Sequence, residues 1–271
     1  MTAEKGMTSL PVALILGPYD PSGAAYLPAD IVRSAALSCH ALSVPTSLLV
    51  RDSAKLEHVQ LLTDEIIDDQ LRCLLEDTLI QAIKSGPVYS PEVASILAEV
   101  SADYSEVPLV LHLTSLPEHT LIDPSWPEDT FDAIYKLVLP QTSLLVVDRA
   151  SLLQWQAEGL LNEDSPATQQ LLDAGVDHVL CTAYGWEAGM PTYRLYSHVD
   201  HLDYTLNMPA ILRQQDLDSL LSTAICAHLA QGLELAAAIE RSIEYLQHAS
   251  QQHFQLGMGQ RQLNHITYRH D

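Results

Sequence analysis

The sequence predicts an α/β protein built on a mostly parallel sheet with helices on both faces. Short apolar runs of strand length alternate along the chain with longer segments whose apolar residues recur at helical spacing. The first apolar run, 12–16, ends abruptly in the loop Gly-Pro-Tyr-Asp-Pro-Ser-Gly and is followed by a helical segment. Strands that alternate with helices are typical of a parallel sheet covered on both sides.

The expected elements follow one another from the N-terminus. The clearest helix covers 63–79, because Ile66, Ile67 and Leu71 recur at helical spacing and acidic residues occupy the opposite face. A proline-containing stretch, 115–128, is expected to be an irregular connection. Strands are expected at 12–16, 43–50, 81–86, 108–113, 143–147 and 176–181, and the other helices at 28–37, 91–100, 168–174, 216–231 and 234–252.

Length and charge limit the function classes. The chain has 271 residues, and we expect a flexible tail at 1–10 and a single domain at 11–271. Acidic residues outnumber basic ones 35 to 13, for a formal net charge of -22, so no nucleic-acid partner is expected. No apolar stretch is long enough to span a bilayer, and no membrane contact is expected. Four widely spaced cysteines and the lack of a signal peptide are typical of a reduced, cytoplasmic protein.

The loop after the first strand is the first candidate for a binding site. In an open parallel sheet, loops at the carboxyl ends of strands face the ligand crevice. Asp20 then offers a carboxylate there, and Gly23 allows a close approach of the backbone. Taken alone, the segment is explained more simply as an ordinary turn between a strand and a helix, with Asp20 as a cap.

Several segments together resemble one family. Residues 18–30 read Pro-Tyr-Asp-Pro-Ser-Gly-Ala-Ala-Tyr-Leu-Pro-Ala-Asp, which is similar to a family loop Gly-Ser-Asp-Pro-Ser-Gly-Gly-Ala-Gly-Ile-Gln-Ala-Asp. Residues 82–87 resemble Ala-Val-Lys-Thr-Gly-Met, and Gly257, Gly259, Asn264 and His265 match a terminal Gly-x-Gly-x-x-x-x-Asn-His run. In order and spacing the chain resembles the hydroxymethylpyrimidine/phosphomethylpyrimidine kinases of the ribokinase-like superfamily. The resemblance implies a ribokinase-like three-layer α/β/α sandwich.

The resemblance also implies the site. It implies ATP-dependent phosphorylation of the pyrimidine half of thiamine, with Mg as the metal. Arg51 stands where the family has a Gln that recognises the pyrimidine edge; a guanidinium only donates hydrogen bonds, whereas an amide also accepts them. The resemblance places substrate binding at Asp20, Gly23, Arg51, Lys84 and Gly86, nucleotide binding at Thr182, Asp216 and Asp218, the metal at Asp148, and the family's reactive Cys position at Ser219.

The nucleotide and metal positions depart from the family pattern. The family has Gly-Thr-Gly-Cys at the start of the long helix, where backbone N–H groups hold phosphate. Both glycines are aspartates here, Asp216 and Asp218, and carboxylates repel a triphosphate. Asp216 is expected to be the N-cap of the helix. Asp148 keeps an oxygen ligand, but the Glu of the family's Asn-x-x-Glu element is replaced and the Asp-Pro of a preceding strand is His112-Leu113.

Three functional hypotheses remain open. The first is an ATP- and Mg-dependent kinase of hydroxymethylpyrimidine or its phosphate, supported by Asp20, Gly23 and Lys84. The second is a homologue with lost or much reduced phosphoryl transfer that binds a pyrimidine-like molecule or a regulatory partner. The third is a different enzyme whose crevice binds an anionic substrate through Arg51 and Lys84. The second is preferred, because phosphoryl transfer fails without a phosphate-binding loop. A homodimer is expected.

Overall fold

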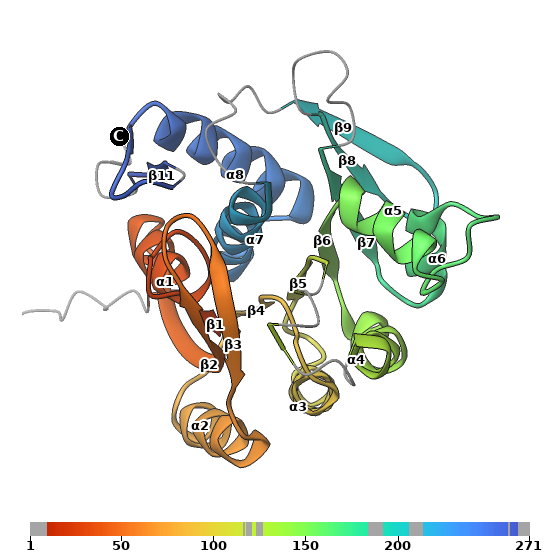
Figure 1. Cartoon of the computed structure of the whole chain (residues 1–271), viewed down its shortest axis with the longest axis horizontal. Helices are drawn as coiled ribbons and strands as arrows, with labels where there is room; N and C mark the ends of the chain where they lie inside the picture. Colours follow the sequence, from red (N-terminus) through yellow and green to blue (C-terminus); the bar gives the residue numbers. More distant parts are fainter. Residues whose placement is uncertain are drawn as a thin grey trace, which may run out of the picture.

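The computed structural model describes residues 10–115, 117, 121–122, 127–183, 192–205, 214–259 and 261–264. In this part of the chain, nine strands form one sheet in the order β3-β2-β1-β4-β5-β6-β7-β8-β9 (Figure 1). The strands are β1 (Val12–Tyr19), β2 (His40–Arg51), β3 (Leu56–Leu61), β4 (Ala82–Ser85), β5 (Leu109–Leu113), β6 (Leu144–Asp148), β7 (His178–Thr182), β8 (Thr192–Tyr196) and β9 (His201–Thr205). A short separate pair is formed by β10 (His253–Phe254) and β11 (Gln262–Leu263).

The centre of the sheet is parallel and its two edges are antiparallel. Strands β2, β1, β4, β5, β6 and β7 pair in parallel, whereas β3 pairs antiparallel with β2, and β8 and β9 extend the other edge as antiparallel strands. The chain runs outward from β1 to β2 in one direction and from β4 to β7 in the other. The strand order therefore reverses between β1 and β4, which is where ligands bind in open α/β sheets.

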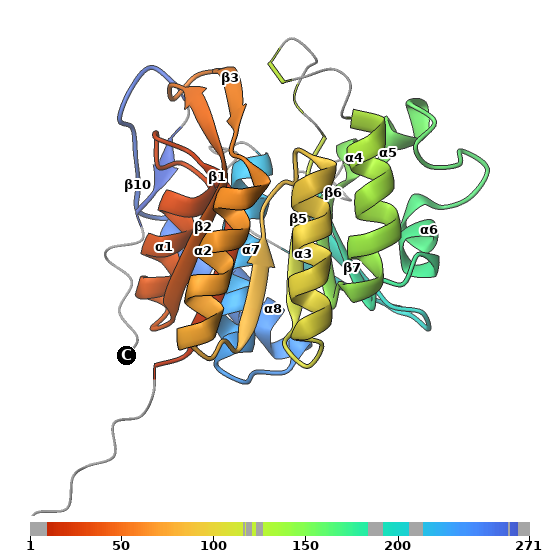
Figure 2. The same ribbon diagram turned by 90° about the horizontal axis from the view of Figure 1, so that it is seen from below.

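Helices cover both faces of the sheet (Figures 1 and 2). One buried apolar cluster joins the sheet to the first helix and the last two, and a second joins its other face to the helices between them. The helices are α1 (Tyr26–Ala36), α2 (Asp64–Asp77), α3 (Pro91–Asp103), α4 (Pro127–Ala133), α5 (Arg149–Ala157), α6 (Ala167–Asp173), α7 (Gln214–Ala230) and α8 (Leu235–Ser250). The predicted three-layer α/β/α sandwich with a mostly parallel sheet is confirmed.

Every strand and helix expected from the sequence is present, with shifted ends. The first strand extends to Tyr19, because Gly17 and Pro18 still pair with β2. The helix expected at 216–231 begins at Gln214, so Asp216 lies in its first turn and the prediction that Asp216 is the N-cap is wrong. The expected irregular stretch 115–128 lies mostly outside the described residues, but α4 already begins at Pro127. Most of the tail expected at 1–10 also lies outside them.

The strands at the centre of the sheet are nearly continuous apolar runs. All residues of β5 are buried, and β6 and β7 bury almost all of theirs, as expected for parallel strands with helices on both sides. No helix in the described part of the chain combines the length and the hydropathy needed to cross a membrane.

Candidate active-site crevice

The Asp20 loop is held in shape by its own carboxylate. Asp20 is fully buried, and its Oδ1 accepts hydrogen bonds from the Ser22 backbone N–H at 2.9 Å and from Ser22 Oγ at 2.7 Å. Its Oδ2 accepts a bond from the Ala25 N–H at 3.3 Å. Gly23 closes the turn by donating to the Asp20 carbonyl at 3.1 Å and has a φ of +68°, a conformation that favours glycine. The hydrogen bonds within the loop therefore fix its shape.

Arg51 lies directly against this loop. It ends β2, its side chain is 6% exposed, and its Nη1 lies 3.4 Å from Asp20 Oδ2. Its Nε donates to the Asp52 carbonyl at 3.2 Å. The structure therefore brings together two of the predicted substrate-binding residues, and it brings them together as an ion pair.

Two tyrosines that the sequence analysis did not identify fill the same region. Tyr26 and Tyr89 are buried in a small cluster with Leu49 and Val59, and their hydroxyl groups are hydrogen-bonded to each other. Burial raises the pKa of Tyr26 well above its ordinary value, with Tyr89 and Asp216 adding to the effect, and raises the pKa of Tyr89 to about 12. Both hydroxyls therefore stay protonated at neutral pH.

Tyr26 also has a strained backbone. Its φ is +56°, which is uncommon for any residue except glycine and costs about 1 kcal/mol or more for a bulky side chain. The family loop has Gly at the matching position, so the tyrosine in the printed sequence is the signal that marks this site. Strain of this kind persists where the surrounding structure requires it, often at functional positions.

The residues at the start of α7 lie on the other side of the candidate site. Asp218 is fully buried, and its Oδ2 accepts a hydrogen bond of 2.8 Å from Thr182 Oγ1 at the end of β7. Ser219 Oγ accepts a bond of 3.2 Å from the backbone N–H of Tyr26. Asp216 is buried and close enough to Tyr26 to raise its pKa. The predicted nucleotide positions and Ser219 therefore do meet at the N-terminal end of α7, in contact with the Asp20 loop.

Lys84 already has an ion-pair partner inside the protein. It is fully buried in β4, and its Nζ lies 2.5 Å from Asp30 Oδ2 on α1. Asp30 Oδ1 also accepts bonds from Arg33 Nη1 at 3.2 Å and Thr223 Oγ1 at 2.6 Å. Lys84 and Arg51 thus each have a carboxylate partner already. That placement disfavours the hypothesis in which both cations bind an anionic substrate.

Gly86 has a structural role at the reversal point of the sheet. Its N–H donates to the Leu16 carbonyl at 2.8 Å, and a Cβ on Gly86 would lie 3.3 Å from Pro18 Cδ. The lack of a side chain at Gly86 lets the end of β4 lie close against Gly17 and Pro18 of β1.

The predicted magnesium position does not fit a metal. Both carboxylate oxygens of Asp148 are occupied by Ser151, from its N–H at 2.8 Å and its Oγ at 2.9 Å, so Asp148 caps α5. His112 is fully buried, and among the residues that the structure describes neither ring nitrogen has a hydrogen-bond partner. Burial, with a smaller effect of Lys84, lowers its pKa well below 6.5. Within the described ranges, no three His, Cys, Asp or Glu residues come together as metal ligands.

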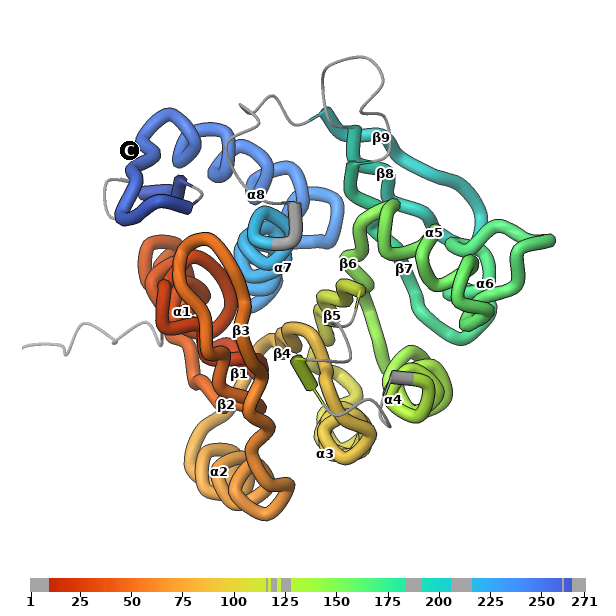
Figure 3. Tube along the Cα trace, viewed as in Figure 1, coloured from red at the N-terminus to blue at the C-terminus, as the bar shows by residue number. Residues whose placement is uncertain are grey.

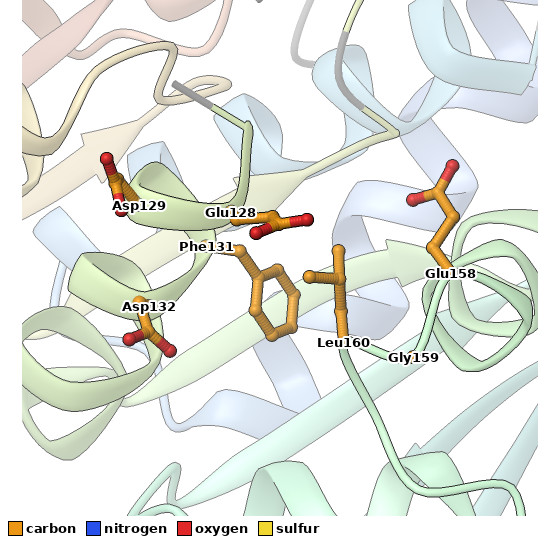
Figure 4. Close-up of a pocket in the computed structure, with 7 residues that line it drawn as sticks. All are labelled: Glu128, Asp129, Phe131, Asp132, Glu158, Gly159 and Leu160. Atoms are coloured by element: carbon orange, nitrogen blue, oxygen red, sulfur yellow. The ribbon is translucent and has the colours of Figure 1, made fainter. Parts of the chain in front are cut away.

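A separate cavity lies far along the sheet from these residues. It has a volume of about 400 Å³ between α4 and the end of α5, and Figure 4 shows its acidic lining around the Phe131 ring. None of the predicted site residues lines it. The lining residues are Glu128, Asp129, Phe131, Asp132, Glu158, Gly159 and Leu160.

A parallel sheet between two helical layers, with an ordered loop at its reversal point and the start of a long helix beside it, defines the fold of the ribokinase-like small-molecule kinases. The chain belongs to the phosphomethylpyrimidine kinase family, whose sequence profile matches residues 20–264. The resemblance drawn from the sequence is confirmed.

Similar proteins support the same assignment over almost the whole length. The hydroxymethylpyrimidine/phosphomethylpyrimidine kinase of Streptomyces coelicolor is 23% identical over 266 residues, covering 96% of each chain. The structure of Bacillus subtilis pyridoxal kinase, an ADP complex, has a TM-score of 0.80 at 18% identity and covers 95% of this chain and 98% of that chain. The phosphomethylpyrimidine kinase of Clostridium difficile has a TM-score of 0.70 at 22% identity, covering 88% and 100%. At identities of 18% and 22%, the likeness to these two structures establishes the fold of this chain.

Proposed function

We propose that this member of the family binds a small pyrimidine-like ring in its crevice and has lost most or all of its phosphoryl transfer. The observation that carries the proposal is the buried hydrogen bond between Asp218 and Thr182. It places a carboxylate of the protein where the family pattern has a glycine whose backbone faces phosphate. A carboxylate in the first turns of a helix is stabilised by the helix dipole, so Asp218 takes the electrostatic role of a bound anion.

A nucleotide triphosphate is disfavoured at this place for two reasons. Asp216 and Asp218 both lie at the start of α7, and like charges repel strongly when they are poorly solvated. The family's magnesium positions supply no matching countercharge, because Asp148 is used as a helix cap and His112 is buried and uncharged. We therefore derive no catalytic step through ATP or magnesium.

The substrate side of the crevice supports retained binding of a small ring. Asp20 and Gly23 hold the loop in an ordered turn, and the hydroxyl groups of Tyr26 and Tyr89 lie next to Arg51. Aromatic rings with a few fixed polar groups are typical of small-molecule sites. The regulatory or partner-binding role, the homodimer and the cytoplasmic location stay predictions that this proposal does not require.

An active vitamin kinase is the second candidate. The specific observation that favours it is the preserved Asp20 turn, in which the Asp-Pro-Ser-Gly residues of the family loop are kept and the Asp20 carboxylate accepts three hydrogen bonds. Its ligand then comes from the class that the relatives' names describe, hydroxymethylpyrimidine, its phosphate or pyridoxal.

The two candidates differ in turnover. We propose incubating the purified chain with Mg-ATP and each of hydroxymethylpyrimidine, hydroxymethylpyrimidine phosphate and pyridoxal, and measuring ADP and phosphorylated product by chromatography. The proposal expects no product above the rate without protein. Product that forms with any of the three, and disappears in an Asp20→Asn variant, contradicts the proposal and supports the active kinase.

A further inference from the structure

The end of the chain contacts both elements that border the crevice. Gly259 N–H donates to Ser53 Oγ at 3.2 Å, in the turn between β2 and β3. Gln262 Nε2 donates to the Ser22 carbonyl in the Asp20 loop at 3.1 Å. Figures 2 and 3 show the β10–β11 segment beside α1 and the β2–β3 hairpin, although more than two hundred residues separate them along the chain. We call residues 252–259 and 261–264 the C-terminal clasp.

The two glycines of the clasp both lie against Ser53. A Cβ added to Gly257 would lie 2.7 Å from Ser53 Oγ, at the tip of a side chain that can rotate away. A Cβ added to Gly259 would lie 1.8 Å from the Ser53 carbonyl oxygen and 2.7 Å from the Ala54 nitrogen. These are backbone atoms, so the hairpin turn and the clasp can touch as they do only if residue 259 is glycine. This contact gives a physical reason for the Gly-x-Gly run.

The clasp is fixed at its far end. Leu263 is buried in the apolar cluster that joins the sheet to α1, α7 and α8, and the Asn264 N–H donates to the Gln252 carbonyl at 2.9 Å. The pairing of β10 with β11 holds the segment between these points. A contact made by the clasp is therefore anchored to the core and does not move freely.

The contacts form a closed ring that includes Asp20 and Arg51. Ser53 is two residues after Arg51, and Ser22 is two residues after Asp20. The ring runs from Asp20 to Arg51 through their ion pair, from Ser53 to Gly259, and from Gln262 back to Ser22. Tethering two loops at a fixed separation removes the conformational freedom that they would otherwise lose when a ligand binds.

We propose that the C-terminal clasp positions Arg51 over Asp20, so that Gly259, Ser53 and Gln262 are positioning residues that set the separation between the Asp20 loop and the β2–β3 hairpin. The role of this separation in ligand binding rests on the function proposed above. The positioning itself does not, because it concerns contacts within the free protein.

The first test is hydrogen exchange of the free protein. Gly259→Ala separates the clasp from the hairpin, and we expect the amides at 20–25 and 51–56 to exchange at least about tenfold faster. Met258→Ala is the matched control, because its side chain lies between the two glycines and is 99% exposed; it leaves exchange unchanged. Gly257→Ala has an intermediate effect, because the Ser53 hydroxyl can rotate. Faster exchange confined to the clasp, or none anywhere, overturns the proposal.

A second variant keeps the test decisive if Gly259→Ala does not fold. Gln262→Glu keeps the size of the side chain but removes the donor to the Ser22 carbonyl. We expect faster exchange at 20–25 with little change at 51–56. Unchanged exchange at 20–25 shows that the clasp does not hold the Asp20 loop and contradicts the proposal.

The third test asks whether the effect passes through Arg51. In an Arg51→Gln background, Gly259→Ala should add less to exchange at 20–25 than it does in the wild-type chain, because only the Gln262 link from the clasp to the Asp20 loop remains. An undiminished effect in that background refutes a positioning role through Arg51. Titration of the same variants with hydroxymethylpyrimidine tests the ligand separately. If the wild-type chain does not bind the pyrimidine while the exchange pattern is as expected, the proposed function is wrong. The positioning role of the clasp is then still supported.

Discussion

Arg51 Nη1 lies 3.4 Å from Asp20 Oδ2, so an ion pair occupies the place where the family pattern has a glutamine facing a pyrimidine. The pair is one of several interactions that hold Asp20. Its two oxygens also accept hydrogen bonds from Ser22 and from the Ala25 N–H. Asp20 therefore keeps three donors when Arg51 is replaced, and the substitution changes the charge and the donors beside it.

Replacing the arginine by glutamine should improve pyrimidine binding. In Arg51→Gln the side chain can accept as well as donate, and the ligand no longer competes with a cation for Asp20. We expect hydroxymethylpyrimidine to bind roughly fivefold more tightly, about 1 kcal/mol, by calorimetry. Arg72→Gln, in an exposed pair with Asp69 on α2, is the control and should leave binding unchanged. Equal affinity in wild type and Arg51→Gln means that Arg51 does not face the ligand.

Because the backbone at Tyr26 is strained, the smaller of two replacements should give the more stable variant. Tyr26→Gly and Tyr26→Ala both lose the buried ring, which costs about 3 kcal/mol. Glycine also relieves the φ of +56°, whereas alanine does not. The glycine variant should therefore be the more stable of the two by about 1 kcal/mol in urea unfolding. An alanine variant that is at least as stable as the glycine variant shows that the backbone at this position is not strained.

The buried charges around Asp30 should be important for stability. Lys84→Met leaves Asp30 with Arg33 and Thr223 but removes its closest partner. Breaking a buried pair from one side costs about 3 kcal/mol in the free energy of unfolding. Lys136→Met, in an exposed pair with Asp132, is the matched control and should change little. Comparable unfolding midpoints for the two variants would argue against the Lys84 network as a stabilising element.

His112 should make the protein acid-sensitive. Burial, and to a lesser extent Lys84, lowers the pKa of this histidine well below its ordinary value of 6.5 in the folded state. Only the unfolded chain binds a proton near pH 6, so the stability from neutral His112 is complete above pH 6.5 and is lost as the pH falls below it. The loss therefore grows as the pH falls from 6.5 towards 5.

Replacement of His112 by leucine checks this pH dependence. The stability of His112→Leu should fall less steeply than that of the wild-type chain as the pH is lowered, measured by urea unfolding at pH 6.5, 6, 5.5 and 5. His58→Gln, at an exposed position on β3, is the control because it removes a histidine without altering the interior. Parallel profiles for wild type and His112→Leu rule out the buried histidine as the source of acid sensitivity.

The central part of the fold follows from local sequence, and its edges do not. Strands β5, β6 and β7 are continuous apolar runs, which are typical of parallel strands buried on both sides. The antiparallel strands β3, β8 and β9 were missed because their residues are partly polar and lie at an edge, where burial is not continuous. Helix α5 was missed because its apolar residues show little periodicity.

The candidate site could be predicted as a set of positions but not as a set of contacts. The family resemblance predicted that Asp20 and Arg51 lie at one site, and in the structure the two side chains form an ion pair. It gave no indication that Lys84 pairs with Asp30, which is 54 residues away, because two charges that distant in sequence carry no spacing signal. Tyr26 was overlooked although it replaces a glycine of the family loop, and a bulky residue at such a position indicates strain in the folded chain.

The most direct test of the account is a calorimetric titration of the chain with Mg-ATP, compared with the Asp216→Gly, Asp218→Gly double variant. The account predicts no binding to the wild-type chain at millimolar ATP. In the double variant, removal of two carboxylates should bring measurable affinity, a gain of at least about tenfold, despite about 2 kcal/mol lost to two helical glycines. Micromolar binding to the wild-type chain, or no gain in the double variant, would contradict the view that Asp216 and Asp218 exclude nucleotide.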